Sequence, residues 1–332
     1  MGFQKNVEHF LVKLTLSLRL IAISLLLVAS TTFAQFPARP VKLVVPAGAG
    51  GPTDVVARVL ANGLSEAWGK QVLVENRPGA GGNPGAEVVV RAAPDGHTLL
   101  LGSAGPIVIN MSLYPNLRVD PRRELAPISQ LTSVPMVLFV TPATPAKTLA
   151  ELVRHVKEHP GKLNYASTGI GTMPHLAGEL LKRQAGLDLV QVPYKAVPAA
   201  VAALMAGEVI AFFDTPTGFA NARAGKLRAL AVAAKVRFSG APDVPTTAEA
   251  GYPGLLADSW YGLLAPLQTP RELRVKIHAD VAKVLLAPET KARLASLGFD
   301  VVTSTPDAFS DTITSESERW ASFVKTLGIR ME

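Results

Sequence analysis

The 332-residue chain contains no cysteine. This absence excludes disulfide bonds, thiol nucleophiles and cysteine-ligated metal sites. Aromatic residues are also scarce, at 6 % of the chain, and the formal net charge is only +7. No basic cluster is longer than two residues; one is Arg122-Arg123, and an acidic residue, Glu124, follows it. Because nucleic-acid interfaces carry basic runs interleaved with aromatic residues, the sequence predicts no nucleic-acid partner and a mildly basic surface.

Long apolar runs are missing beyond residue 34, so we expect a soluble mature protein. The chain begins with basic residues, followed by an apolar stretch at 20–29 that is too short to cross a bilayer comfortably. A small-x-small pattern ends at Ala34. We therefore predict a signal peptide over residues 1–34, cleaved so that the mature chain starts near Gln35. An uncleaved membrane anchor is the alternative. An exported protein without disulfides is typical of the bacterial periplasm.

The most informative motif is the segment 43–54, which reads as an apolar strand, a glycine-rich turn and the start of a helix. This order places free backbone N–H groups at a helix N-terminus, where the macrodipole favours an anion. The turn, residues 48–51, has no Lys, Arg or His, so backbone alone would hold the anion. That arrangement suits a small carboxylate that must bind and later leave. A tight turn without a ligand is the alternative.

Better-known motifs are excluded by their spacing. No Lys follows the glycines, as a phosphate-binding P-loop requires, and Thr53 stands where a dinucleotide fingerprint needs its third glycine. The second glycine cluster, residues 79–85, fails in the same way at Pro84. Neither Gly-x-Ser-x-Gly nor HExxH occurs. The sequence therefore predicts no catalytic residues, no metal and no cofactor.

Strand-like and helix-like segments alternate along the chain, which predicts an α/β fold with mainly parallel sheets flanked by helices. Ligands on such sheets bind beyond the carboxyl ends of the strands, where the glycine turn and Ser103 lie. Strands are predicted at residues 41–45, 71–75, 97–101, 135–140, 162–166, 190–193, 209–213, 227–233 and 259–265. Helices are predicted at residues 53–68, 85–93, 149–158, 175–185 and 196–206, and as three closing helices. The last carries an apolar stripe that predicts a core contact.

The pattern restarts after the proline-rich residues 141–145, which predicts two lobes. Lobe 1 would comprise residues 35–137 and 260–332, and lobe 2 residues 138–259. The chain would cross between them near 136–140 and 259–264. Two crossing strands make a hinge, and a hinge between two lobes makes a cleft that can close.

The second lobe repeats the opening theme at residues 165–175, where hydroxyl-rich Ser167 to Thr172 separate a strand from a helix. Two such turns could share one carboxylate across the cleft. Asp54 either complements the helix dipole or accepts from a water or a ligand ammonium. Asp214, at a strand end, is either a turn carboxylate or a cleft group that tunes ligand choice. His175 is interpreted as a packed or capping residue rather than a metal ligand or base.

Several segments in order along the mature chain resemble one family: residues 39–46, 49–54, 74–83, 93–100, 161–167, 174–179, 192–195, 224–232 and 242–246. They are similar to the Bug proteins, TctC-like solute-binding components of tripartite tricarboxylate transporters. The resemblance implies a periplasmic type II binding protein with a Venus-flytrap cleft. It also implies a small organic carboxylate as ligand, often held through ordered waters, and membrane permease subunits as partners; we expect a monomer.

The ligand-binding residues that we predict, from the turns and this resemblance together, are Gly48, Ala49, Gly50, Gly51, Thr53, Asp54, Ser103, Ser167, Thr168, Gly171, Thr172 and Asp214. The chain departs from the family pattern at Gly48-Ala49, where an aromatic-then-small pair is common, and at Ala196, where glycine is usual. The first departure lies in the binding turn itself, so ligand identity does not transfer. Alternative functions are a ligand-responsive sensor subunit for a signalling receptor and an enzyme acting on a carboxylate.

Overall fold

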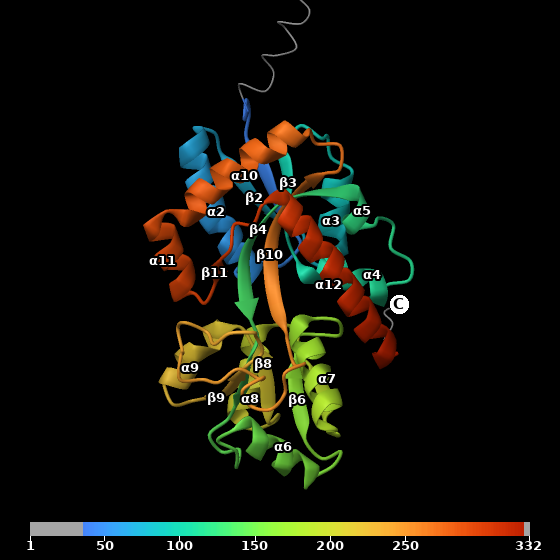
Figure 1. The fold of residues 1–332 in the computed structure, drawn as a ribbon, viewed down its shortest axis with the longest axis vertical. Coiled ribbons are helices and arrows are strands. Elements are labelled where there is room, and N and C mark those ends of the chain that lie inside the picture. Colours follow the sequence, from blue (N-terminus) through green and yellow to red (C-terminus); the bar gives the residue numbers. More distant parts are fainter. Residues whose placement is uncertain (1–35, 329–332) are drawn as a thin grey trace, which may run out of the picture.

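The computed structural model describes residues 36–328, so the predicted signal peptide and cleavage site lie outside the described part of the chain. The described residues form two β-sheets, one at the centre of each half of an elongated molecule (Figure 1). Within residues 36–328, no helix combines the length and the apolar character needed to cross a membrane.

The upper sheet in Figure 1 begins with the predicted βαβαβ unit. Its elements are β1 (Val41–Val45), α2 (Pro52–Trp68), β2 (Val72–Asn76), α3 (Asn83–Val90) and β3 (Thr98–Ser103). β4 (Leu125–Pro135), β10 (Asp258–Pro266) and β11 (Asp300–Val301) complete a sheet of six strands in the order β11-β4-β10-β3-β1-β2. β1 pairs in parallel with both β2 and β3, which places their carboxyl ends at one edge.

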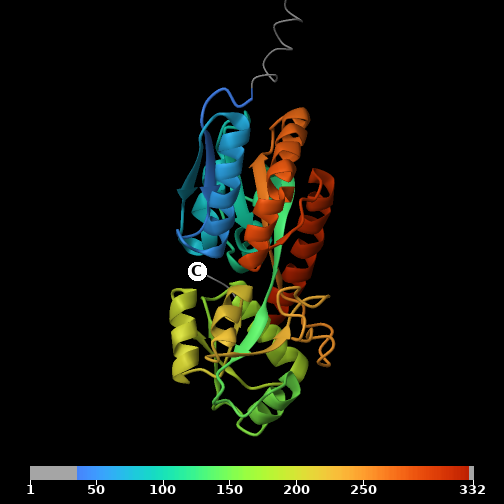
Figure 2. The same ribbon diagram turned by 90° about the vertical axis from the view of Figure 1, so that its left-hand side faces the viewer.

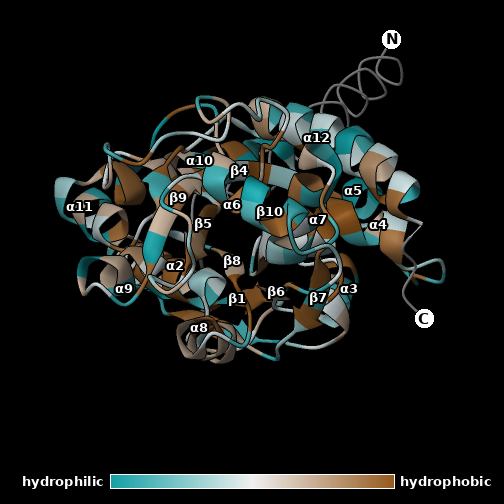
Figure 3. Cartoon of the chain, turned by 90° about the horizontal axis from the view of Figure 1, so that it is seen from below, coloured by the Kyte–Doolittle hydropathy of each residue, from teal (hydrophilic) through white to brown (hydrophobic). Residues whose placement is uncertain are grey.

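The lower sheet has five strands in the order β7-β6-β8-β5-β9. They are β5 (Val137–Val140), β6 (Asn164–Ser167), β7 (Val190–Pro193), β8 (Ala211–Asp214) and β9 (Arg228–Val232). The helices of this half are α6 (Leu149–Lys157), α7 (Met173–Ala185), α8 (Val197–Ala206) and α9 (Phe219–Arg223). Seen along the long axis, apolar residues gather on the central strands and polar residues on the outer sides of the helices (Figure 3).

Two details of the strand prediction need correction. Both sheets are mixed rather than mainly parallel, because β10 runs antiparallel to β3 and β4, and β5 runs antiparallel to β8 and β9. The predicted strand 135–140 is the meeting point of two strands that belong to different sheets, and most of β4 was not predicted. β4 lacks a simple alternation because polar residues such as Ser129 are buried in it. The Ser129 hydroxyl donates to the carbonyl of Ser304 at 2.8 Å.

Backbone hydrogen bonds tie the chain together where it passes between the sheets. The Met136 N–H donates to the Ala257 carbonyl, the Ala257 N–H to the Ala233 carbonyl and the Ala233 N–H to the Met136 carbonyl. The three N···O distances are 3.0, 2.8 and 2.7 Å. We call this set of bonds the waist.

The three predicted closing helices are α10 (Arg271–Leu286), α11 (Pro288–Ser296) and α12 (Pro306–Leu327). The predicted apolar stripe of α12 is core, since Phe309, Ile313 and Trp320 are buried. α12 also reaches the lower half: Arg319 donates to the Leu256 carbonyl, and Arg183 of α7 donates to the Thr326 hydroxyl. Figure 2 shows α12 and the strand that crosses between the halves on the same side of the molecule. Short helical segments follow β3, namely η2 (Gly105–Ile109), α4 (Asn110–Leu113) and α5 (Pro121–Glu124), none of which was predicted.

Candidate functional site

A cavity of about 550 Å³ lies between the two halves, and both contribute to its wall. The upper half contributes residues at the ends of β1 and β3, and the lower half residues at the ends of β6 and β8. The predicted site residues in this wall are Gly48, Thr53, Ser103, Thr168, Gly171, Thr172 and Asp214. The structure therefore brings the two predicted turns, far apart in the sequence, to one cavity.

Two helix N-termini open onto this cavity. α2 begins at Pro52 behind Gly51, and α7 begins at Met173 behind Thr172; neither capping residue uses its side chain to satisfy the helix N–H groups. Thr53 in the first turn of α2 and Met173 in the first turn of α7 both line the cavity. Neither the Thr53 nor the Met173 N–H has a hydrogen-bond acceptor among residues 36–328. Free N–H groups at a helix N-terminus bind an anion without a positively charged side chain.

Asp54 shapes the upper turn instead of lining the cavity. Its Oδ2 accepts from the Gly50 N–H at 2.9 Å and from Arg58 Nε at 2.8 Å, and its Oδ1 accepts from Asn76 Nδ2 at 2.9 Å. The Asn76 amide also donates to the Ala47 carbonyl at 3.0 Å. Burial alone would raise the pKa of Asp54, but the hydrogen bonds from Arg58, Gly50 and Asn76 outweigh it and lower the pKa.

The turn residues Ala49, Gly50 and Gly51 do not line the cavity, and two of their N–H groups are already engaged. The Gly50 N–H bonds to Asp54, and the Gly51 N–H donates to the Gly48 carbonyl at 3.4 Å. Gly50 is needed here for its backbone, since its φ of +78° lies in the left-handed region. The first helical turn behind the loop, more than the loop amides, therefore offers free N–H groups to the cavity.

The lower turn is held by its own polar groups. The Ser167 hydroxyl accepts from the Gly169 N–H at 3.2 Å, and the Thr172 hydroxyl donates to the Gly169 carbonyl at 2.7 Å. His175 is buried, and its Nδ1 accepts from the Gly171 N–H at 3.1 Å. Burial lowers the pKa of His175, which favours the neutral ring that an accepting Nδ1 requires. Ser167 and His175 position this turn and do not line the cavity.

Asp214 is a buried carboxyl group in the cavity wall, with 3 % of its surface exposed. Burial raises its pKa to about 6, and the Thr215 N–H, which donates to Oδ1 at 2.8 Å, offsets only part of that effect. Tyr261 lines the same wall, and burial raises the pKa of its hydroxyl to about 12. The base of the cavity therefore offers a phenol donor beside a carboxyl group whose charge depends on pH.

Sequence reasoning missed several parts of the wall besides Tyr261, and two of them carry a recognisable signal. Lys195 lines the cavity, and it is the only basic residue that does so within the described chain. It follows β7, so its place at a strand's carboxyl end was the available signal. The second glycine cluster also lines the cavity, from Gly79 to Gly82. It follows β2, which is parallel to β1, so its turn had to emerge at the same edge.

The two halves approach each other closely beside the cavity. A Cβ atom placed on Gly171 of the lower turn would lie 2.2 Å from Leu113 Cδ1 of α4 in the upper half. Gly171 also has a φ of +78°. Any side chain at this position would force either the buried Leu113 side chain or the lower turn to move, so this glycine allows the observed closeness of the two halves.

The fold and the cleft define a two-lobed solute-binding protein of the periplasmic type II class. Residues 56–329 match the family described as "Tripartite tricarboxylate transporter family receptor" (TctC). The chain belongs to this family, whose members are solute-binding proteins and not enzymes. BugT of Bordetella pertussis is 36 % identical over 299 residues, covering 90 % of this chain and 92 % of BugT.

Solved structures agree with this assignment. Rpa4515 of R. palustris, solved with adipate, is 33 % identical with a TM-score of 0.82 and covers 89 % of this chain and 99 % of its own. MatC of Rhodopseudomonas palustris, solved with bound malate, is 35 % identical with a TM-score of 0.78, over 87 % of this chain and 100 % of its own. The periplasmic binding protein BugD is 35 % identical with a TM-score of 0.79, over 90 % of this chain and 100 % of its own.

Replacing Asp54 with alanine should lower the free energy of unfolding by about 1–3 kcal/mol at neutral pH, because Gly50 and Asn76 lose a buried acceptor. The pKa of Asp54 is lowered in the folded state, so its stabilisation is present above the unfolded-state value of about 3.9 and is lost as pH falls through the folded-state value. Urea denaturation at neutral and acidic pH measures both effects. Glu66→Ala, an exposed change on the same helix, is the control. Equal stability of Asp54→Ala and wild type at neutral pH would contradict the role of Asp54.

Gly171→Ala should weaken ligand binding at least about tenfold, because the added methyl group keeps the lower turn away from Leu113. Gly169→Ala is the matched control: Gly169 also has a positive φ, of +117°, but its Cβ would meet nothing closer than 3.9 Å. Titration calorimetry of both variants separates backbone strain from the contact between the halves. Adding Leu113→Ala to Gly171→Ala should restore part of the affinity. Equal losses in Gly169→Ala and Gly171→Ala would argue against the contact.

Proposed function

We propose that this protein captures a small organic carboxylate in the cavity between its lobes and delivers it to a membrane transporter from the periplasm. The observation that carries the proposal is the pair of helix N-termini, of α2 and α7, that open onto one cavity. Each hydrogen bond to a charged group contributes roughly 1.5–3 kcal/mol. After the cost of immobilising the ligand, a few such bonds leave about −8 kcal/mol, which corresponds to micromolar affinity.

The division into two lobes, residues 35–137 with 260–332 and residues 138–259, is part of the proposal. Support comes from the two separate sheets and from the passage of the chain between them near Met136 and Ala257. A ligand that contacts both helix N-termini stabilises the closed arrangement, and a membrane partner that favours the open one releases it. The described chain can perform this cycle as a single molecule.

We infer that the ligand carries a second polar group besides the anchored carboxylate. Two relatives were solved with adipate and with malate, and both of these ligands are dicarboxylates. In this chain, exposed Lys195 provides a positive charge in the cavity wall for a second acidic group. Asp214 provides an acceptor for a hydroxyl or ammonium group of the ligand. The cavity of about 550 Å³ has room for such a molecule.

A thermal-shift screen of monocarboxylates, dicarboxylates, amino acids and aromatic acids tests the proposed ligand class. The bound ligand should stabilise the protein by about 2.7 kcal/mol at a hundred times its dissociation constant. Lys195→Gln should weaken a dicarboxylate by about tenfold and leave a monocarboxylate nearly unchanged. Lys226→Gln, an exposed change outside the cavity, is the control. A screen without any stabilising carboxylate would refute the proposed function, and equal losses for both ligand types would refute the role of Lys195.

Asp214→Asn should make the protein more stable but a poorer binder. The pKa of Asp214 is raised to about 6, so wild-type stability falls as pH rises from about 4 to about 6 and stays lower above it. The variant should therefore gain about 1–3 kcal/mol at neutral pH and little at pH 4. Asp258→Asn is the control, because burial also raises the pKa of Asp258 to about 6 and it lies outside the cavity. Denaturation and calorimetry should show both variants stabilised and only Asp214→Asn weakened for a hydroxylated or amino ligand; unchanged affinity in Asp214→Asn would remove Asp214 from the site.

A further inference from the structure

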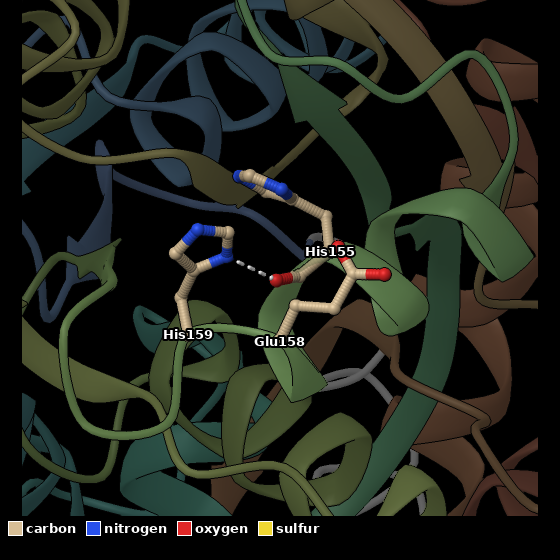
Figure 4. A group of neighbouring side chains, drawn as sticks. All are labelled: His155, Glu158 and His159. Atoms are coloured by element: carbon tan, nitrogen blue, oxygen red, sulfur yellow. Dashed lines mark hydrogen bonds between the residues drawn. The ribbon is translucent and has the colours of Figure 1, made fainter.

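A second candidate binding site lies at the far end of the lower half, on α6, away from the upper sheet (Figure 1). His155, Glu158 and His159 come together there, at the helix's C-terminal end (Figure 4). One potential ligand atom from each of the three lies within 4.8 Å of the others. We propose that these side chains bind a divalent transition-metal ion. None of them lines the cavity between the lobes, so this site is independent of the carboxylate.

The local backbone produces this convergence. His155 lies in the last turn of α6, Glu158 is its C-cap residue and His159 follows directly. The His159 N–H still donates to the Val156 carbonyl at 3.0 Å, so the chain continues to turn and keeps the three residues on one side. The imidazole rings of His155 and His159 lie side by side, with centroids 4.7 Å apart. Two imidazole nitrogens and a carboxylate oxygen can therefore meet one ion once the side chains rotate toward one another.

A backbone contact prepares His159 as a ligand. Its Nδ1 lies 2.9 Å from the carbonyl oxygen of His155, as the dashed line in Figure 4 shows. A carbonyl can only accept, so Nδ1 carries the proton and Nε2 has a free lone pair. Metal-ligating histidines commonly donate their other ring N–H to a carbonyl or carboxylate in this way.

The end of α6 favours a cation, and the types of donor atom determine which cations bind. The C-terminal end of a helix carries partial negative charge, which stabilises a positive ion. Glu158 makes no ion pair among residues 36–328, although Arg154 lies one turn before it on α6. Arg154 and Lys157 lie in the same last turn, so net charge alone does not attract the ion. Two nitrogen donors and one oxygen donor favour Zn²⁺, Ni²⁺ or Cu²⁺ over Mg²⁺ and Ca²⁺, which prefer oxygen alone.

The site is open on its outer side. Glu158 is exposed, and His155 and His159 are both at least partly accessible to solvent. Three protein ligands leave at least one coordination position for water or for a donor from another molecule, unlike the closed set of four ligands in structural zinc sites. The proposed site is thus a surface metal site rather than a metal that holds the fold together.

Metal titration of the mature protein, prepared without a polyhistidine tag, tests this proposal. Calorimetry with Zn²⁺ should show one bound ion per chain, and the spectrum of bound Cu²⁺ in electron paramagnetic resonance should show coupling to two nitrogens. Mg²⁺ and Ca²⁺ should not compete. His155→Gln and His159→Gln should each lower the affinity at least about tenfold and leave a single coupled nitrogen. Glu158→Gln should weaken Zn²⁺ while both nitrogens remain.

His278→Gln is the matched control, because it removes a histidine from a helix of the upper half and should leave metal binding unchanged. Thermal melting without metal verifies that each variant is folded. Wild-type affinity in the double variant His155→Gln, His159→Gln would overturn the proposal, and so would the absence of Zn²⁺ and Cu²⁺ binding by the wild-type chain. Because the carboxylate screen is read without metal, failure of one proposal is distinguishable from failure of the other.

Discussion

The waist hydrogen bonds are the constraint on which the rest of the molecule depends. Met136, Ala233 and Ala257 form a closed set of backbone contacts at the point where the chain passes between the sheets. Because this set fixes the end of β4 beside the start of β10, the parallel strands of the two sheets direct their carboxyl ends at each other. The cavity and both helix N-termini follow from that orientation.

Polar groups of the cavity that lack hydrogen-bond partners lower the free energy of unfolding. Helix N–H groups without partners and a carboxyl group buried at Asp214 both lower the stability of the empty protein. By contrast, the carboxyl group of Asp54 is fully hydrogen-bonded and stabilises the turn that carries the first of these helices. At neutral pH the Asp54 carboxylate therefore stabilises the fold, and the Asp214 carboxylate destabilises it. The difference arises because Asp54 accepts more hydrogen bonds than Asp214 does.

Much of this architecture could be predicted from the sequence. The βαβαβ order, both turns and the closing helices depend on local signals, namely apolar periodicity and glycine positions, which tertiary packing reinforces. β4 was not predicted because neighbours bury it on both sides, so its sequence shows no alternation of apolar and polar residues. β5 and β10 each run antiparallel to their neighbours because the chain enters each sheet at the point where it passes between the halves. No local sequence pattern encodes where that passage lies.

The residues of the cavity wall, like the strands, were predicted only where a local sequence signal marks them. Turn residues next to a strand end were found, and Thr53, Thr172 and Asp214 do line the cavity. Whether a given N–H faces the cavity depends on which neighbour has already bonded it, and the partner can be four residues away, as for Gly50 with Asp54 and Gly171 with His175. Lys195 illustrates the converse, since it lines the cavity but its place after β7 was the one sequence signal for it.

The position of α12 has a consequence for motion. Its contacts with the lower half are made through Arg319 and Thr326, and Figure 2 shows α12 on the same side of the molecule as the strand that crosses between the halves. These contacts and the waist together join the two halves along one edge of the molecule. Any separation of the halves is then largest at the opposite edge. Under the proposed function, we expect the ligand to enter and leave there and the membrane partner to approach from that side.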